Sequence, residues 1–221
     1  MRTQGIPYRI YGGLSFYQRK EIKDVIAYCR LICNHNDEEA LKRIINYPAR
    51  GIGDTTVNKL IDCSQLHAVS AWDVLSDMLK YNLAVNAGTA NKLAQFRDMV
   101  NVFGEQVTTQ NAYDLVNSIV KITGVISDTF VDRSPENLSK QENVQELLKA
   151  IHEFCDSREQ NAESAFLPDF LSEVSLLTDQ DTDKESDTDK ITMMTVHAAK
   201  GLEFKAVFIV GMEEDLFPSA Y

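Results

Sequence analysis

The chain has 221 residues, 44% of them apolar, and a formal net charge of −11. This apolar share is enough for one or two domains with buried cores, and no apolar run approaches the length of a membrane span. No signal peptide is recognised at the start. The acidic balance predicts that the chain alone binds nucleic acid weakly, although contacts through backbone amides remain compatible with it.

The four cysteines do not form a metal-ligand pattern. Cys29 and Cys33 lie four residues apart on an expected helix, but no second pair of Cys or His has ligand spacing. We therefore predict no metal site. Small buried thiols in a cytoplasmic, reducing environment are expected instead.

The N-terminal segment predicts a short strand followed by a helix. The strand covers about Tyr8–Tyr11 and ends at a glycine pair, and Ser15 is the expected N-cap of the helix. On composition alone, Arg19, Glu21 and Asp24 would form a solvated helix face with local ion pairs.

Between about Cys33 and Thr178 the pattern changes to helices without strands. The predicted helices cover Asp37–Ile45, a segment starting at Gly53 or Asp54, Ala71–Tyr81, Thr89–Gln106, Ala112–Ile122, Asn137–Asp156 and Phe166–Leu177. The aromatic side chains expected in their shared core are Trp72, Phe96, Phe103, Phe154 and Phe170.

The turn Gly51-Ile52-Gly53 is the feature of this helical segment that most favours a ligand. Glycines let a backbone approach a phosphate closely, and the N-terminus of the next helix attracts anions. Thr55, Thr56 and Lys59 follow in the first turns and could add donors. The alternative is a plain helical hairpin with a glycine cap, which the local sequence alone favours.

An acidic tract separates the helical segment from the C-terminal residues. Residues 179–190 contain six acids and two bases and no apolar residue. This composition predicts a solvated, flexible loop.

Two apolar runs near the C-terminus predict strands buried on both faces. Ile191–Val196 and Ala206–Val210 are apolar or β-branched, and a polar insert lies between them. Ligands of α/β sheets bind at the carboxyl ends of strands, so this insert is a candidate site. Glu203 in this insert offers acceptors suited to sugar hydroxyls, while His197 and Lys200, with Thr195 at the end of the first run, can donate to phosphate oxygens.

Three stretches resemble motifs of UvrD/PcrA/Rep-type superfamily 1 DNA helicases. Residues 195–204, Thr-Val-His-Ala-Ala-Lys-Gly-Leu-Glu-Phe, with 210–218 after them, resemble motif V of that family. Residues 12–24 resemble motif IV. Residues 48–53, Pro-Ala-Arg-Gly-Ile-Gly, resemble the turn of the mobile accessory subdomain that contacts duplex DNA.

The resemblance implies roles for individual residues. Residues implied at the ATP site are Gly201 and Glu203, with Glu203 on the ribose. Residues implied to contact single-stranded DNA are Phe16, Arg19, Thr195, His197 and Lys200. Residues implied to contact duplex DNA are Gly51, Ile52, Gly53, Thr55, Thr56 and Lys59.

The resemblance also implies the organisation of the chain. The expected fold is mostly α, with a helical accessory subdomain (2B) at residues 34–187. This subdomain would be inserted into part of the second RecA-like motor domain (2A), residues 1–33 and 188–221, whose two ends would form a small partial parallel α/β sheet. A sheet cut in this way exposes edges, so we expect either self-association or disorder of the flanking strands, while the helical part stays folded.

The function implied is that of a piece of an ATP-dependent DNA helicase, moving 3′ to 5′ by family analogy. The sequence contains no Gly-x-x-x-x-Gly-Lys-Ser/Thr phosphate loop and no arginine-bearing motif VI. The chain alone is therefore expected to hold no catalytic residue and no bound cofactor, with ATP and Mg²⁺ acting in the full-length parent. The alternatives are a helicase-nuclease of the same superfamily and a non-enzymatic helical module that binds DNA or protein.

Overall fold

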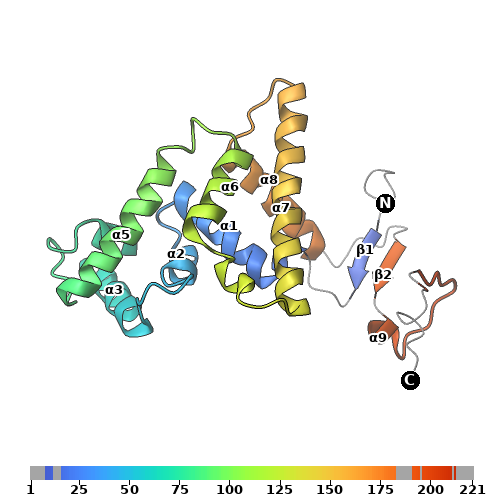
Figure 1. Ribbon diagram of the computed structural model, residues 1–221, viewed down its shortest axis with the longest axis horizontal. Helices are drawn as coiled ribbons and strands as arrows, with labels where there is room; N and C mark the ends of the chain where they lie inside the picture. The colour runs from blue at the N-terminus through green and yellow to red at the C-terminus, as the bar shows by residue number, and fades with distance from the viewer. Residues whose placement is uncertain (1–7, 12–15, 183–190, 195, 211, 213–221) are drawn as a thin grey trace. The chain divides into compact units, whose positions relative to one another are not determined.

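A computed structural model describes residues 8–11, 16–182, 191–194, 196–210 and 212 (Figure 1). They divide into two units: a helical unit, Leu14–Lys184, and an end unit that joins Met1–Gly13 to Glu185–Tyr221. The fold is mostly helical, as predicted. Within the described ranges no helix is long and apolar enough to cross a membrane.

Helix α1 (Lys20–Cys33) is the centre of the helical unit. It contacts α2, α5, α6, α7 and α8, and its buried face includes Ile22, Val25 and Leu31. Because α1 packs there, the boundary between these two units falls after Gly13. The division into subdomains at residues 33 and 187 stays a prediction.

The start of α1 differs from the prediction. Ser15, the expected N-cap, lies outside the described residues, and Arg19 precedes the helix without a side-chain cap bond. A short 3₁₀ helix, η2 (Phe16–Gln18), comes before it. Phe16 and Tyr17 pack against the core, and their burial sets the chain direction before the α-helix begins.

The next three helices begin at side-chain or glycine caps. Asp37 caps α2 (Glu38–Ile44) by accepting from the amide of Ala40, and Gly53 is the N-cap of α3 (Asp54–His67). Ser70 and Asp73 form a capping box at α4 (Ala71–Ser76). These starts match the sequence prediction.

Helix α4 ends earlier than the predicted Tyr81. The Asp77 carboxylate accepts a hydrogen bond from the amide of Lys80 at 3.0 Å, which favours a turn over a further helical turn.

Four longer helices and a 3₁₀ helix complete the unit. They are α5 (Ala87–Gly104), α6 (Ala112–Thr123), η3 (Ser127–Phe130), α7 (Pro135–Gln160) and α8 (Leu167–Thr182). Helix α7 begins two residues before the predicted Asn137, with Pro135 in its first turn and Ser134 as the cap. Helix α8 extends over the first four residues of the expected loop at 179–190, and residues 183–190 lie outside the described part.

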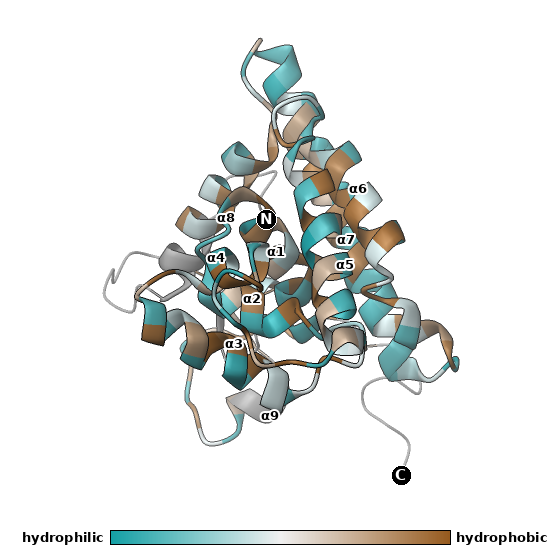
Figure 2. Ribbon diagram, turned by 90° about the vertical axis from the view of Figure 1, so that its left-hand side faces the viewer, coloured by the Kyte–Doolittle hydropathy of each residue, from teal (hydrophilic) through white to brown (hydrophobic). Residues whose placement is uncertain are grey.

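The helical core confirms the aromatic prediction. Trp72, Phe96, Phe103, Phe154 and Phe170 are all buried. Hydrophobic and hydrophilic residues occur along the same helices in Figure 2, as amphipathic helices around a shared core require.

In the end unit, β1 (Tyr8–Tyr11) pairs in parallel with β2 (Ile191–Met194), with Tyr8 opposite Ile191. A short helix, α9 (Val196–Ala199), follows. The predicted strand at 206–210 was wrong, because this segment has no regular secondary structure and its side chains are exposed. A run of this kind adopts a buried strand only where neighbouring strands pair with it, and no such pairing is recorded among the described residues.

Candidate nucleic-acid interface

The turn between α2 and α3 places three residues in different environments. Gly51 has φ +68°, in the left-handed region where glycine is favoured. Ile52 is fully buried and fixes the turn to the core. Gly53 is exposed and extended, with φ −79° and ψ 167°, immediately before the first turn of α3.

Asn46 fixes the backbone on both sides of Gly51. Its side-chain oxygen accepts from the amide of Arg50 at 2.9 Å and from the amide of Ile52 at 3.0 Å. The turn therefore has a defined shape without any ligand.

Arg50 is a structural residue that the sequence analysis did not assign. Its Nη1 donates to three backbone oxygens, those of Ile44 (3.0 Å), Tyr47 (2.9 Å) and Pro48 (3.2 Å). These carbonyls belong to the last residue of α2 and to the segment after it, where the helix supplies few donors of its own. The only local sequence signal for this role was an arginine immediately before Gly51-Ile52-Gly53.

Aromatic rings from two other helices enclose the Arg50 guanidinium. It lies 5.3 Å from the ring centroid of Phe96 on α5 and 5.8 Å from that of Tyr28 on α1. Nη2 donates to the Tyr28 hydroxyl, which donates in turn to the Tyr47 carbonyl. Burial raises the pKa of Tyr28, so the hydroxyl remains a donor at neutral pH.

The two glycines present different surfaces. A side-chain carbon at Gly51 would lie 2.5 Å from Nζ of Lys92, which donates to the Gly51 carbonyl at 3.3 Å. A side-chain carbon at Gly53 would have no atom within 4 Å. The open approach to this backbone is therefore at Gly53.

The donors predicted after the turn are accessible to different degrees. Thr55 and Lys59 are exposed, and Thr56 is half-buried. Nζ of Lys59 donates to the carbonyl of Ala84 at 3.0 Å. The Gly53 carbonyl accepts from the amides of Thr56 and Val57, so the unoccupied N-terminal amides of α3 are those before them.

The residues of the motif IV resemblance lie together at the start of α1. The Arg19 guanidinium lies 5.4 Å from the Phe16 ring centroid and donates from Nη1 to the side-chain oxygen of Asn143 on α7. Asn143 donates to the Glu21 carboxylate at 2.6 Å. Arg19 is thus partly committed to joining α1 to α7.

Asp24, another residue of the motif IV resemblance, makes an ion pair within the helical unit. It is 4% exposed and pairs with Nε of Arg43 at 2.7 Å. Burial raises the pKa of Asp24, while Arg43 acts in the opposite direction. The pair joins α1 to α2.

The motif V residues lie in the end unit. Lys200 and Glu203 are exposed, and Gly201 has φ +82° with nothing within 4 Å of an added side-chain carbon. His197 belongs to the backbone of α9, and Thr195 lies outside the described residues.

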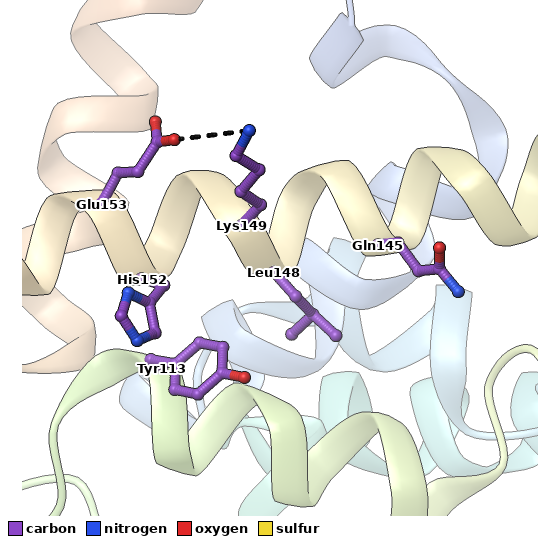
Figure 3. Close-up of a pocket in the computed structure, with 6 residues that line it drawn as sticks. All are labelled: Tyr113, Gln145, Leu148, Lys149, His152 and Glu153. Atoms are coloured by element: carbon purple, nitrogen blue, oxygen red, sulfur yellow. Dashed lines mark ion pairs between the residues drawn. The ribbon is translucent and has the colours of Figure 1, made fainter.

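A shallow groove between α6 and α7 is a separate feature (Figure 3). Tyr113 on α6 faces Leu148 and His152 on α7, with Lys149 and Glu153 paired at 3.8 Å on the rim. His152 pairs with Asp156 at 2.9 Å. Since these charges have partners on their own helix, the groove does not extend the phosphate-binding surface proposed below.

No group of three or more potential metal ligands occurs in the part of the chain that the structure describes. Cys29 and Cys33 are free thiols. Burial raises the pKa of the Cys33 thiol to about 11 and raises that of Cys29 further.

The chain is thus mostly helical, and the backbone at the start of α3 is exposed and already held in a defined shape. The whole chain, residues 1–221, matches the family described as UvrD-like helicase C-terminal domain, and the chain belongs to that family.

Curated relatives extend well beyond this chain. DNA helicase II of Salmonella typhimurium is 35% identical over 216 residues, which cover 97% of this chain and 29% of the relative. ATP-dependent DNA helicase PcrA of Bacillus subtilis is 37% identical over 223 residues, with the same coverage of 97% and 29%. The chain spans less than a third of the length of these relatives.

Proposed function

We propose that this chain is part of an ATP-dependent DNA helicase that translocates 3′ to 5′ on single-stranded DNA and unwinds duplex DNA. Its family and the names of its relatives support this proposal. The observation that carries its specific role is the open backbone face at Gly53, held at the N-terminus of α3. In this role the Gly51–Gly53 turn contacts the duplex backbone.

The chemistry of the turn suits a phosphate. The first amides of a helix have no internal acceptors, and the helix dipole places partial positive charge there. Thr55 and Lys59 add a hydroxyl and a cation within the first two turns of α3. Contacts of this kind carry no base information, so binding here is sequence-independent and salt-sensitive.

Motifs IV and V supply the remaining contacts in this proposal. Phe16 offers a ring for base stacking, and Arg19 keeps Nε and Nη2 for single-stranded DNA while Nη1 binds Asn143. Thr195, His197 and Lys200 would add donors to the phosphates of that strand, as the motif V resemblance implies. The exposed Glu203 carboxylate, beside the open Gly201, suits the ribose hydroxyls of ATP.

The phosphates and Mg²⁺ would be held by other parts of the parent protein. The chain carries no phosphate-loop sequence, so we propose that it does not hydrolyse ATP alone. In the parent, residues 34–187 would serve as the accessory subdomain 2B, and residues 1–33 and 188–221 as part of motor domain 2A. The net charge of −11 is consistent with a chain that binds DNA through local contacts of its backbone amides.

The test replaces Gly53 in the parent helicase. Gly53→Asp keeps a good N-cap in a conformation that aspartate adopts readily, yet its carboxylate occupies the helix amides and repels phosphate. Gly53→Asn adds nearly the same bulk without the charge. We expect Gly53→Asp to weaken binding of a duplex with a single-stranded tail by on the order of tenfold, and Gly53→Asn less.

Fluorescence titrations with the tailed duplex and with the bare single strand measure this effect. Both variants should bind the single strand like the wild type, and Lys121→Ala, an exposed site on α6, should bind both like the wild type. Equal losses on the two substrates would mean that the turn only supports the fold. No loss on either would remove the turn from the DNA interface.

A further inference from the structure

The Gly51–Gly53 turn has a neighbouring cation from a distant helix. Lys92 lies on α5, 41 residues along the chain from Gly51, and its Nζ fills the space that a side chain at Gly51 would take. The Lys92 side chain is otherwise exposed. A side chain at Gly51 would therefore displace this ammonium, besides being strained by the positive φ.

The acceptor of Lys92 is a neutral carbonyl, and so is that of Lys59. Other lysines of the helical unit bind carboxylates instead, as Lys42 does with Glu38 at 2.5 Å and Lys140 with Glu136 at 2.7 Å. Among the described residues no ion pair within 4.0 Å involves Lys59 or Lys92. Neither ammonium is thus paired with a carboxylate, and that of Lys92 lies at the turn itself.

We infer that Lys92 is a second phosphate-binding cation of this turn. The ammonium exchanges the Gly51 carbonyl for a phosphate oxygen of duplex DNA. The site then combines the positive charges of α3 with the Lys92 ammonium on α5. This inference rests on the proposed duplex contact. The exchange is favourable because the phosphate oxygen carries a negative charge that attracts the ammonium, whereas the Gly51 carbonyl is neutral.

The Lys92 ammonium lies on only one side of the proposed site. Lys92 covers the turn at Gly51, whereas Gly53 is open. A phosphate that approaches the α3 amides at Gly53 therefore meets Lys92 on one side, and Lys59 projects from the second turn of α3. One backbone segment of a duplex, with its regularly spaced phosphates, can bind both cations.

The experiment measures the salt dependence of tailed-duplex binding by the parent helicase. Each phosphate neutralised by a protein cation contributes about 0.9 to the slope of log affinity against log salt. We expect Lys92→Gln to lower this slope by roughly 0.9 and the low-salt affinity several-fold. Lys92→Arg should restore the slope, and Lys121→Gln on α6 should leave it unchanged.

The slope separates a phosphate contact from a structural role. If Lys92 only steadies the Gly51 carbonyl, Lys92→Gln will lower the melting temperature or the affinity while the slope stays at the wild-type value, and the inference fails. The Gly53→Asp variant separates this failure from that of the proposed function. A loss with Gly53→Asp and an unchanged slope with Lys92→Gln would reject Lys92 alone, whereas no effect of either would reject the duplex site itself.

Discussion

Arg50 fixes the shape of the turn at Gly51–Gly53, and it does so without contacting a ligand. Its guanidinium satisfies three carbonyls after α2 and is enclosed by Tyr28 and Phe96. Arginine suits this place because its planar group combines several donors with ring stacking. The resemblance to a duplex-contacting turn covers Arg50, but its partners assign it to the fold.

Replacing Arg50 should destabilise the helical unit. Arg50→Met removes the hydrogen bonds to the carbonyls of Ile44, Tyr47 and Pro48 and leaves that of Pro48 without a donor, and we expect a loss of roughly 2–4 kcal/mol in the free energy of unfolding. Arg50→Lys should recover only part of it, since an ammonium cannot reproduce the geometry of the guanidinium. Urea unfolding followed by circular dichroism measures both, with exposed Arg133→Met as the matched control. A wild-type unfolding midpoint for Arg50→Met would contradict this role.

The role of Arg50 could not be predicted from the sequence. Its acceptors are local, but the two rings come from α1 and α5, far away along the chain, and no spacing connects them. The glycines and Lys59 were singled out as candidates because they carry a local pattern. Lys92, like Arg50, makes its contacts without any such pattern around it.

At the scale of elements, capping residues in the sequence predicted the helix starts, because capping hydrogen bonds form between neighbouring residues. Asp37 before α2 and Ser70 before α4 are caps whose hydrogen bonds lie within four residues, and both helices begin where predicted. The end of α4 depended on a competing side-chain turn at Asp77, which the apolar pattern does not contain. The strand expected at 206–210 depends on pairing partners, which no local pattern can supply.

The loop between α1 and α2 is joined to α4 by a ring stack. His35 stacks on Trp72 with centroids 4.2 Å apart, and its Nε2 is buried without a hydrogen-bond partner among the described residues. Desolvation lowers the pKa of His35 below its usual 6.5. Protonation therefore opposes the packing of this loop on α4.

This stack should make the stability of the helical unit depend on pH. Because the pKa of His35 is lower in the folded state, the unfolded chain binds more protons below pH 6.5, so folding loses stability as the pH falls through that value. We expect the urea midpoint to fall between about pH 7.5 and pH 5.5, and to fall less in His35→Phe, which keeps the ring. An equal fall in both proteins would assign the pH dependence to other groups.

At the scale of the whole molecule, the two units differ in how well they bury their apolar residues. The helical unit encloses a continuous core around α1. In the end unit, Phe208 is 91% and Val210 86% exposed. Burying an apolar side chain of this size is worth about 1.5–3 kcal/mol, so these residues favour association when a partner surface is available.

We therefore expect the isolated chain to self-associate through the end unit. Sedimentation velocity should show a mass that rises with protein concentration, and Phe208→Lys should lower it by removing apolar area and adding charge. Leu79→Lys is the matched control, because Leu79 is equally exposed at 91% but belongs to the helical unit. A monomer at all concentrations, or an equal effect of both variants, would contradict this assignment.

The Arg50 network has a mechanical consequence. Through Tyr28 and Phe96 it connects the turn to α1 and α5, and through the carbonyl of Ile44 it connects the turn to α2. A force applied to the backbone at Gly53 would therefore be shared among three helices and would not stretch one loop.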